Sequence, residues 1–469
     1  MSVEANEAAK TLPDLKLEPA GLEWSSEKTQ LSIGFVASVL VCLAAFWQTT
    51  GIGFLLDDFL HLDQVVRAFQ GDRRDFLSNL YANWGGSDLM VSYRPLVSLS
   101  VLADYLFWRT NAFGYHLTNL IVYSICALFA GLITFDLTAK QGNLLRPSMA
   151  IWAALLFLFY PVHLESVAWV IGRVDLFCTA FYLISVFAFS RFRILQERHY
   201  LYLSLAAFVF ALTSKEMAVT LPVVLLLLVF LVPTNAICSG GNAGDRDLER
   251  SSAPRNMFFS IRGDLAAVGL FFAVLGLFAV CRAILLGSAV GGYGSFDPAT
   301  LIASLANFAD RSSIMKVAVP INEELHPLKS IIPFIVPAYG LLAAVAAYRC
   351  LINRQLARVC LFLIAWMVVA LLPTFQIWHV YPNLVGSRLF FTSSAPFCML
   401  LAIGALPGLD ALSRIRLRAV TVIGTLGLVW IASAWAVMTW ENMQPWIEAG
   451  QQMKSLRLQI EQLRNEGTP

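Results

Sequence analysis

Charged residues are scarce in this sequence of 469 residues. Only 14% of the residues are Asp, Glu, Lys or Arg, whereas 58% are apolar and the mean hydropathy is +0.67. Because a soluble domain carries about a quarter charged residues, this shortage excludes a soluble globular protein. The formal net charge of +2 is too small to suggest a nucleic-acid partner.

Cysteine and histidine are also few, with eight and six residues in the chain. None of the cysteines falls in a segment that we place outside the cytoplasm, so no disulfide framework is expected. Three histidines, His61, His116 and His163, stand near other polar groups but in separate segments. Their spacing does not fit a zinc site.

The sequence instead contains many long apolar runs. Runs of roughly 18 to 25 residues, the length that crosses a hydrocarbon core as a helix, recur from Leu31 to Trp440. The sequence therefore predicts an all-α polytopic membrane protein with about eleven transmembrane helices. These are expected near residues 31–53, 114–138, 148–162, 166–190, 200–214, 217–233, 264–286, 331–348, 359–378, 389–408 and 419–440.

The polar N-terminus, residues 1–30, contains two prolines and no basic run before a short apolar core. We expect a cytoplasmic tail followed by a retained signal anchor, not a cleaved signal peptide. The transmembrane domain should cover 31–440. It should carry outer loops at about 53–113 and 287–330, a flexible inner loop at about 233–263, and an outer-face helical tail at 441–469. The first outer loop is expected to hold amphipathic helices, including a stretch that ends at Trp108.

The basic residues predict the orientation of these spans, because short cytoplasmic loops are enriched in Lys and Arg. With the N-terminus inside, all five predicted inner loops contain Lys or Arg. The short outer turns near 163–166, 214–217 and 379–388 contain only Lys215 and Arg388. We therefore predict an N-in, C-out protein with an odd number of spans.

Polar residues gather near the outer ends of the predicted spans. An ionisable group in the hydrocarbon costs roughly 2.5 to 3.5 kcal/mol, so such groups are candidates for function. A channel or carrier would carry polar groups through both halves of the bilayer, whereas this pattern favours a site open to the outer face. The group consists of Asp57, Asp58, His61, Tyr93, Arg94, His116, Asn119, His163, Glu165, Arg173, Asp175, Lys215, Glu216 and Arg388. Several tryptophans near the predicted interfaces, including Trp84 and Trp169, are expected to be ordinary interfacial anchors.

The adjacent acids Asp57 and Asp58 have the clearest chemical meaning. Two carboxylates could bind a divalent cation, Mg²⁺ or Mn²⁺, or one could act as a general base while the other orients a partner. Burial among apolar neighbours such as Phe54 and Phe59 would raise the pKa of such an acid. The alternative is a solvated loop or a helix cap.

The pairs His163–Glu165 and Arg173–Asp175 stand eight residues apart. In an extended turn His163 and Glu165 point the same way, but Arg173 and Asp175 lie about 200° apart on a helix and cannot face one point. Arg173 is therefore either a functional residue of the outer group, or it pairs with a carboxylate elsewhere in the bundle and holds the helices in register.

The basic residues of the two later outer turns, Lys215 and Arg388, lie at head-group depth. Either could neutralise the phosphate of an anionic lipid. The alternative for Lys215 is a snorkelling side chain beside the carboxylate of Glu216. For His116, a satisfied histidine at a helix end is the alternative to a ligand.

An ordered set of segments resembles membrane glycosyltransferases of the GT-C class, and among them the TMTC-type O-mannosyltransferases and their bacterial relatives. The segments are LDDFLH at 56–61, YRPL at 93–96, YHLTNL at 115–120, FYPVHLESVAWVIGRVDL at 159–176, SKEMAVTLP at 214–222 and GSRLF at 386–390. Two features differ from the family pattern. Ser387 stands where an acidic residue is expected, and the residues after Trp440 contain no tetratricopeptide array.

The resemblance implies an inverting transfer from a polyprenyl-phosphate-linked sugar on the non-cytoplasmic face. Asp57 or Asp58 would activate the acceptor hydroxyl, and Arg388, with Lys215 and Arg173, would hold the donor phosphate as the leaving group. The remaining polar residues of the outer group would bind or support the substrates, namely His61, Tyr93, Arg94, His116, His163, Glu165, Asp175 and Glu216.

The leading hypothesis is therefore a glycosyltransferase that moves a sugar, mannose-like by resemblance, to a protein Ser or Thr, a lipid or a cell-wall glycan. A transporter or flippase is the alternative, with Arg173, Asp175, His163 and Glu165 as a proton or ion relay. The third hypothesis is a membrane scaffold that keeps the fold and has lost the catalytic activity. The short loops favour a bacterial inner membrane, or the endoplasmic reticulum if the source is eukaryotic.

Overall fold

The computed structural model describes residues 21–86, 90–139, 145–233, 257–289, 292–293, 311–374, 377–407 and 414–465. These residues are almost entirely helical. Within them, the two short strands β1 (Met90–Val91) and β2 (Gly292–Tyr293) pair antiparallel. The prediction of an all-α protein is confirmed for this part of the chain. Most of the expected cytoplasmic tail and of the flexible inner loop lies outside the described residues.

Within the described ranges, eight helices are long and apolar enough to cross a membrane, and a ninth crossing results if one bent pair counts as a single span. The bent pair joins α6 (Arg146–Phe159) to residues 161–168 at an angle of 51°. The two remaining predicted spans, 200–214 and 217–233, coincide with α9 (Arg198–Leu212) and α10 (Leu221–Leu231), of 15 and 11 residues. The apolar helices thus indicate an integral membrane protein. The number of eleven transmembrane helices and their orientation in the membrane remain predictions.

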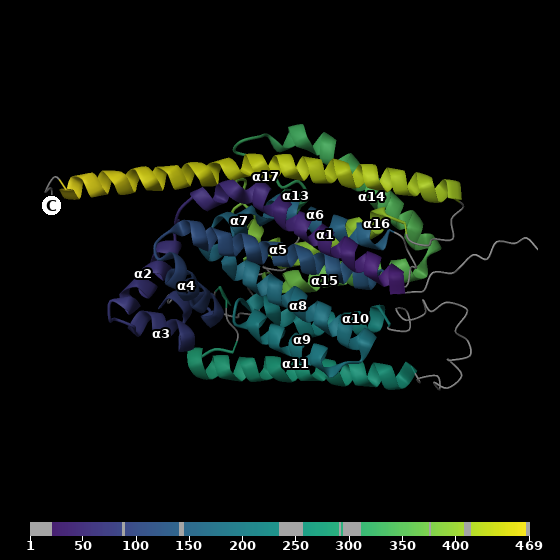
Figure 1. Cartoon of the computed structure of the whole chain (residues 1–469), viewed down its shortest axis with the longest axis horizontal. Helices are drawn as coiled ribbons and strands as arrows, with labels where there is room; N and C mark the ends of the chain where they lie inside the picture. Colours follow the sequence, from purple (N-terminus) through teal and green to yellow (C-terminus); the bar gives the residue numbers. More distant parts are fainter. Residues whose placement is uncertain are drawn as a thin grey trace, which may run out of the picture.

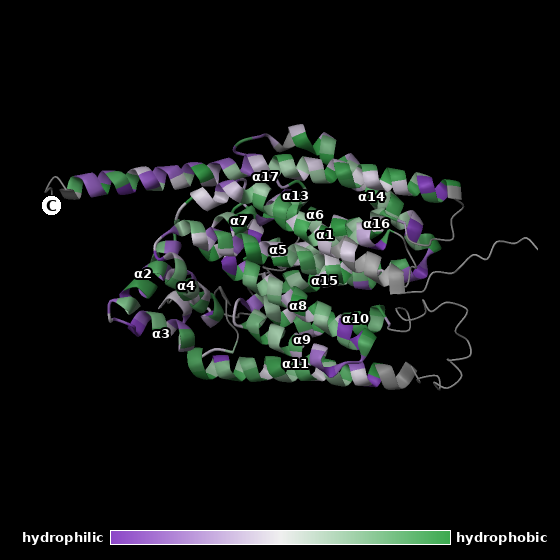
Figure 2. Cartoon of the chain, in the orientation of Figure 1, coloured by the Kyte–Doolittle hydropathy of each residue, from purple (hydrophilic) through white to green (hydrophobic). Residues whose placement is uncertain are grey.

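The centre of the bundle is α5 (Ala112–Leu137), which packs against α6, α8 and α1. In Figure 1, α11 runs along one edge of the bundle, and α17 and α14 run along the opposite edge. Hydrophobic residues cover most of the bundle (Figure 2), as expected for helices in lipid. The other helices that build the bundle are α1 (Gly21–Phe46), α8 (Arg173–Leu195), α11 (Met257–Leu286), α14 (Leu328–Ile352), α15 (Arg354–Leu371) and α16 (Phe391–Ala405).

The first outer loop forms a small helical unit at one end of the bundle (Figure 1). Trp84 lies at its centre: its indole N–H donates to the Ser98 hydroxyl at 3.0 Å, and the His61 ring stacks on it at 4.1 Å between centroids. Trp84 is therefore a core residue of this unit and not the interfacial anchor that the sequence suggests. The unit consists of η1 (Trp47–Gly51), α2 (Asp58–Phe69), α3 (Arg74–Tyr81), η2 (Trp84–Gly86) and α4 (Pro95–Trp108).

Helix α4 differs from the amphipathic stretch that the sequence predicts. One face is buried through Val97 and Val101, whereas Leu106 and Phe107 on the rest of its surface are 51% and 83% exposed. Both faces are therefore apolar. Its 14 residues are too few to cross a bilayer, but they suit a helix in contact with the membrane surface.

Helix α17 (Arg414–Asn465) continues without interruption through the last predicted span and into the expected C-terminal tail. Gly450 allows this extension to contact the first outer loop. A Cβ atom on residue 450 would lie 2.2 Å from the Ile52 carbonyl oxygen, which is too close, so a larger residue would prevent the contact. In Figure 2 the far end of α17 mixes hydrophilic and hydrophobic residues. Four short helical segments form turns between the longer helices: η4 (Pro161–His163), α7 (Leu164–Ala168), η5 (Val170–Gly172) and η10 (Ser387–Phe390).

Charged contacts also occur at the end of the bundle opposite the first outer loop, which the sequence analysis missed. Arg191 pairs with Asp136 at 2.7 Å, and Arg193 pairs with Asp264 at 2.9 Å. Arg349 is fully buried and donates to backbone carbonyls at the end of α16. Polar groups are therefore not confined to one end of the bundle, and these contacts link helices through side chains or backbone carbonyls.

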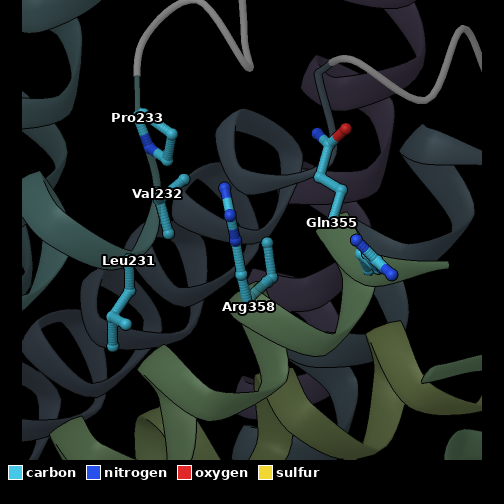
Figure 3. Close-up of a pocket in the computed structure, with 7 residues that line it drawn as sticks. Leu231, Val232, Pro233, Gln355 and Arg358 are labelled. Carbon is cyan, nitrogen blue, oxygen red and sulfur yellow. The ribbon is translucent and has the colours of Figure 1, made fainter. Parts of the chain in front are cut away.

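A pocket of about 280 Å³ opens at the inner ends of α10 and α15 (Figure 3). Arg354 and Arg358 line one side of it, and the apolar end of α10 through Pro233 lines the other. It lies at the opposite ends of these helices from the outer polar residues, and we assign it no role in the site described next.

Candidate active site

The two adjacent acids at the start of α2 have different environments. Asp58 is buried, and its two carboxylate oxygens each accept a backbone N–H at 2.8 Å, one from Leu55 and one from Ile171. Asp57 is exposed. The acid pair thus consists of one carboxylate that fixes the backbone and one that remains accessible.

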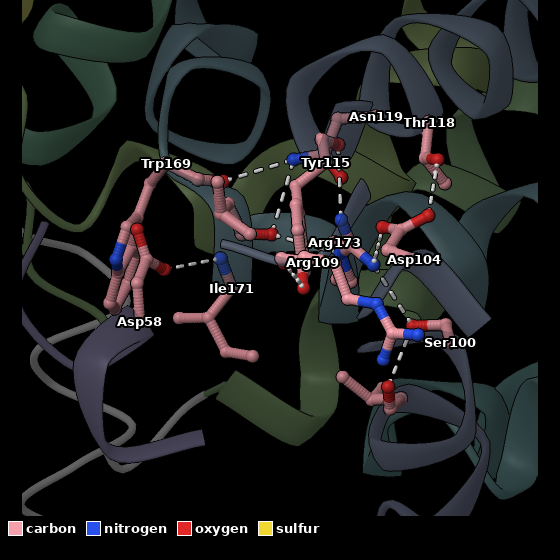
Figure 4. A network of polar contacts seen from close by, with 12 residues as sticks. Asp58, Ser100, Asp104, Arg109, Tyr115, Thr118, Asn119, Trp169, Ile171 and Arg173 are labelled. Carbon is pink, nitrogen blue, oxygen red and sulfur yellow. Dashed lines mark hydrogen bonds and ion pairs between the residues drawn. The ribbon is translucent and has the colours of Figure 1, made fainter. Parts of the chain in front are cut away.

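The segment from Gly53 to Asp58, which we call the strap, is held against the rest of the protein at several points. Asp58 binds the N–H of Ile171, and the Trp169 indole N–H donates to the Leu55 carbonyl at 3.3 Å. The His116 Nε2 atom lies 3.0 Å from the Gly53 carbonyl oxygen, so this nitrogen carries the proton and donates. Figure 4 shows the Asp58–Ile171 contact beside Trp169. The position of Asp57 is therefore fixed by residues far away in sequence.

The turn that carries Trp169 is positioned by α5 and by a glycine. The Asn119 amide donates to the Trp169 and Val170 carbonyls at 3.1 and 3.2 Å (Figure 4). A Cβ atom on Gly172 would lie 2.7 Å from the Ser166 carbonyl oxygen, so only glycine permits this close approach. The turn is therefore a rigid support for the strap.

Arg173 is fully buried in a network below this turn (Figure 4). It pairs with Asp104 at 2.7 Å and donates to the Ser100 hydroxyl at 3.3 Å and to the Tyr115 carbonyl at 3.0 Å. Thr118 donates a further bond to Asp104 at 2.7 Å. This geometry favours the second interpretation of Arg173, in which it pairs with a distant carboxylate and ties the outer loop to the bundle.

Arg388 lies at the edge of the same site. Its guanidinium stands 4.9 Å from the centroid of the Trp169 ring, and its Nε atom is 3.3 Å from the Glu165 carboxylate. The side chain is 26% exposed, unlike Arg173. Glu165 also accepts the backbone N–H groups of Gly386 and Arg388 at 3.0 and 3.1 Å. Glu165 therefore holds both the backbone and the side chain of Arg388.

Lys215 and Glu216 point to different partners. Lys215 forms a buried ion pair with Asp175, whereas Glu216 pairs with Arg94 at 3.2 Å and with Arg282 at 3.6 Å. The snorkelling alternative for Lys215 is thus not what the structure shows, because its partner is Asp175 and not its neighbour. Glu216 instead joins the outer loop to the end of α11.

His163 and Ser387 lie behind the site, in the helix bundle. His163 is fully buried; its Nε2 atom is 2.6 Å from the Ser394 hydroxyl and its Nδ1 atom is 2.9 Å from the Tyr123 hydroxyl. Ser387, which replaces the expected acid, donates to the Val162 carbonyl at 3.0 Å. These contacts connect the turn that precedes Glu165 to α16 and η10, so both residues position the site without facing it.

His61 and Tyr93 belong to the interior of the outer loop. Tyr93 donates its hydroxyl to the Leu80 carbonyl at 3.0 Å. Burial lowers the pKa of His61 to about 4, and the nearby charge of Arg94 adds to this effect. His61 is therefore neutral at pH 7 and stabilises the loop by its stack on Trp84.

Burial also affects Asp58. It raises the pKa of the Asp58 carboxyl to about 7, against the opposing effect of the two amide donors and of Arg173. The sequence analysis expects such a rise for an acid among apolar side chains. It occurs at the acid that binds the backbone, so this rise does not by itself identify a general base.

The acid pair does not fit a divalent metal site. Both oxygens of Asp58 are taken by amide donors, and the described ranges contain no group of three or more His, Cys, Asp or Glu side chains that could hold a metal ion. A magnesium or calcium site needs several oxygen ligands from one side. We derive no step through a metal.

Two residues that matter here, Asp104 and Trp169, were not identified as site residues by the sequence analysis, and a third, Asn119, stood in the outer polar group without a role of its own. Asp104 partners Arg173, Asn119 holds the turn, and Trp169 bridges the strap and Arg388. Asp104 carries a signal, since it is an acid within the apolar stretch 95–108. Trp169 is only 7% exposed, so it is not the interfacial anchor that was expected.

Known proteins similar to this chain are O-mannosyl-transferases. Protein O-mannosyl-transferase Tmtc3 of Drosophila melanogaster is 29% identical over 209 residues, which cover 39% of this chain and 21% of that protein. Tmtc1 of the same organism is 30% identical over 196 residues, 40% of this chain and 21% of that protein. Human TMTC4 is 37% identical over 111 residues, 21% of this chain and 15% of that protein. No protein-family model matches the chain.

The chain resembles the TMTC-type O-mannosyltransferases. It spans about a fifth of the length of the curated relatives it matches, so the resemblance concerns a part of those proteins. It supports a membrane-embedded glycosyltransferase and does not favour the transporter hypothesis.

Proposed function

We propose that this protein is an inverting glycosyltransferase that moves a sugar from a polyprenyl-phosphate-linked donor to an acceptor hydroxyl. The observation that carries the proposal is the bridge made by Trp169, which contacts the strap through Leu55 and Arg388 through its ring. The strap also carries Asp57, an exposed carboxylate, so this bridge supports a site that combines Asp57 with the partly exposed guanidinium of Arg388. A base and a cation are the two groups that such a transfer needs.

In this mechanism Asp57 is the general base. Its carboxylate takes the proton of the acceptor hydroxyl as the oxygen attacks the anomeric carbon of the sugar. The bond between that carbon and the phosphate oxygen breaks on the opposite face, so the configuration inverts. The polyprenyl phosphate leaves with the electron pair, and the charge of Arg388 stabilises it.

The other residues act through these two. Asp58 and His116 hold the strap, and Glu165 fixes Arg388. Lys215 and Arg173, which the resemblance assigns to the phosphate, are buried against carboxylates, so we assign them to support of the site. A leaving phosphate needs positive charge more than a proton, and Arg388 meets this need at the surface of the site.

We further propose a mannose-like sugar and a site on the non-cytoplasmic face. The names of the relatives support the sugar, and the basic inner loops support the orientation. The acceptor is a protein hydroxyl, a lipid or a glycan. The short loops support a bacterial inner membrane, with the endoplasmic reticulum as the eukaryotic equivalent.

The test is release of labelled sugar from mannosyl polyprenyl phosphate by the purified protein in lipid. Wild type should release the label in the presence of acceptor, and Asp57→Asn should reduce release by about 10²- to 10⁴-fold, the usual contribution of a general base. Asp63→Asn is the matched control, because Asp63 is also an exposed acid on α2. Equal release by wild type and Asp57→Asn would remove the assigned base. No release with any polyprenyl-linked sugar would refute the transferase.

A further inference from the structure

The pocket of about 280 Å³ between α10 and α15, which we call the arginine pocket, combines an apolar wall with a basic one (Figure 3). The apolar wall consists of Leu231, Val232 and Pro233, at the point where α10 ends. The basic wall consists of Arg354 and Arg358 on α15, and both side chains are exposed. A ligand in this pocket would therefore contact two guanidinium groups on one side and hydrocarbon on the other.

The two arginines of the pocket are not neutralised by the protein. They are four residues apart on α15, so they lie on the same side of the helix. Within the described ranges neither guanidinium forms an ion pair with a carboxylate. Arg193, at the same end of the bundle, is by contrast paired with Asp264 at 2.9 Å. The arginine pocket thus carries two positive charges that are open to an anion.

The placement of these charges on α15 is unfavourable without an anion. Arg354 is the first residue of the helix, where the helix dipole already contributes positive charge, and a second cation four residues later repels it. The backbone cannot be the main anion site, because the Asn353 side chain accepts the N–H groups of Gln355 and Leu356 at 3.0 and 3.1 Å. An anion held by the two side chains would relieve both repulsions.

The depth of the pocket in the membrane indicates where this anion comes from. Residues Arg354–Thr374 are long and apolar enough to cross a membrane, and Arg354 is the first of them. Arg358 follows about 6 Å further along the helix axis. The pocket therefore lies at the boundary of the hydrocarbon on whichever face this end of the bundle stands, and lipid phosphate groups lie at the same depth.

The surface of α15 beyond the pocket distinguishes a lipid from a soluble anion. Leu361 and Val368 follow Arg358 at spacings of three and seven residues, so they continue the face that carries the arginines. They are 52% and 49% exposed. This face is thus charged at its beginning and apolar along the rest, as a phospholipid is. A free phosphate has no part that would contact the apolar residues.

We propose that the arginine pocket binds the head group of an anionic glycerophospholipid. The phosphodiester oxygens accept hydrogen bonds from Arg354 and Arg358, and the glycerol packs against Leu231. The acyl chains leave the pocket along Leu361 and Val368. The bound lipid would join the end of α10 to the start of α15. This inference does not depend on the proposed function, because the pocket lies at the opposite ends of these helices from the candidate active site.

The experiment uses the full chain, purified in detergent and depleted of lipid, and counts bound lipids by native mass spectrometry. Short-chain phosphatidylglycerol is the probe, and phosphatidylcholine of the same chain length is the neutral comparison. Arg354→Gln/Arg358→Gln should raise the Kd for phosphatidylglycerol roughly tenfold or more and leave that for phosphatidylcholine unchanged. Arg416→Gln/Arg418→Gln is the matched control, since it removes the same charge from exposed residues at the start of α17, outside the pocket.

A second variant tests the pocket without a change of charge. Leu231→Trp enlarges a side chain of the apolar wall, so it should reduce the affinity for phosphatidylglycerol by occupying the space of the head group. Phe230→Trp is its control, because Phe230 is 61% exposed and does not line the pocket. All four variants should melt like wild type in phosphatidylcholine. Phosphatidylglycerol should raise the melting temperature of wild type and not that of Arg354→Gln/Arg358→Gln.

Several results would overturn the inference. Equal affinity of wild type for the two phospholipids would remove the anion site. An equal loss in Arg416→Gln/Arg418→Gln would reduce the effect to general electrostatic attraction. Displacement of the lipid by an equal concentration of inorganic phosphate would identify a soluble anion as the ligand. Tighter binding of polyprenyl phosphate than of phosphatidylglycerol, lost in Arg354→Gln/Arg358→Gln, would assign the pocket to a different lipid.

Discussion

Asp58 accepts a hydrogen bond from the backbone N–H of Ile171, which lies 113 residues further along the chain. This bond joins the start of α2 to the turn before α8, and the Leu55 N–H completes the coordination of the same carboxylate. The two neighbouring acids therefore have different roles. Asp58 shapes the strap, and Asp57 is left accessible on it.

Replacement of Asp58 should therefore affect folding before chemistry. In Asp58→Ala the N–H groups of Leu55 and Ile171 both lose their acceptor. An unsatisfied buried donor costs about 1 to 3 kcal/mol, so the variant should have a clearly lower apparent melting temperature in detergent or lipid. Asp57→Ala, at the exposed neighbour, is the control and should melt like wild type. Equal melting temperatures for both variants would contradict the assigned role of Asp58.

Replacement of Arg388 should weaken donor binding. Arg388→Gln removes the charge that we assign to the phosphate but keeps a side chain that packs on Trp169. A hydrogen bond to a charged group contributes about 1.5 to 3 kcal/mol, so the Kd for polyprenyl phosphate should rise roughly 10- to 100-fold. Titration of the unlabelled lipid phosphate measures this. Arg109→Gln, in the first outer loop, should not change the Kd; an equal loss in both variants would point to general electrostatic attraction.

The Arg173–Asp104 pair should be essential for stability. Asp104→Ala leaves a fully buried guanidinium without its carboxylate, and breaking a buried pair from one side costs about 3 to 5 kcal/mol. We expect poor expression and a strongly lowered melting temperature. Asp63→Ala provides the comparison, since Asp63 pairs with Arg67 at the surface, where ion pairs contribute about 1 kcal/mol or less. Normal stability of Asp104→Ala would show that the charge network does not hold the outer loop.

Burial of His61 should lower the stability of the outer loop in mild acid, against the opposite contribution of Asp58, whose raised pKa of about 7 favours the folded state as the pH falls. The pKa of His61 falls from 6.5 to about 4 on burial, so between these values the unfolded chain binds a proton that the folded protein does not. This contribution is present above pH 6.5 and is lost as the pH falls toward 4, by at most about 3 kcal/mol at 1.36 kcal/mol per pH unit. His61→Phe keeps a ring on Trp84 and should make the melting temperature at pH 4.5, relative to that at pH 6.5, higher than in wild type. His199→Phe, at an exposed position, should leave it unchanged.

The sequence locates the parts of the candidate site better than it assigns their roles. Asp57, Glu165 and Arg388 can be selected from sequence because ionisable residues at the ends of apolar runs are rare. Asp57 and Asp58 cannot be distinguished that way. Their difference depends on which carboxylate faces Ile171, and this contact exists only in the folded chain.

The same limit applies to Arg173 and to the spans. The helical geometry excludes a common target for Arg173 and Asp175, and the structure gives them separate partners, Asp104 and Lys215. Hydropathy does not identify these partners, because they come from other helices. Hydropathy locates the long apolar helices of the described ranges, but it does not decide whether a short helix such as α10 crosses the bilayer, because this depends on its neighbours and not on its own length alone.

The continuous helix α17 has a mechanical consequence. With 52 residues it is about 78 Å long; it holds the last predicted span at one end, and at the other it lines a cleft of about 540 Å³ together with Gly53, Phe54 and Phe59. A transmembrane helix changes its tilt when the hydrocarbon thickness changes. Since Gly450 rests on Ile52 as a pivot, a different tilt moves Leu456 and Ile460 relative to the strap. The width of this cleft would thus report the thickness of the membrane in which the protein resides.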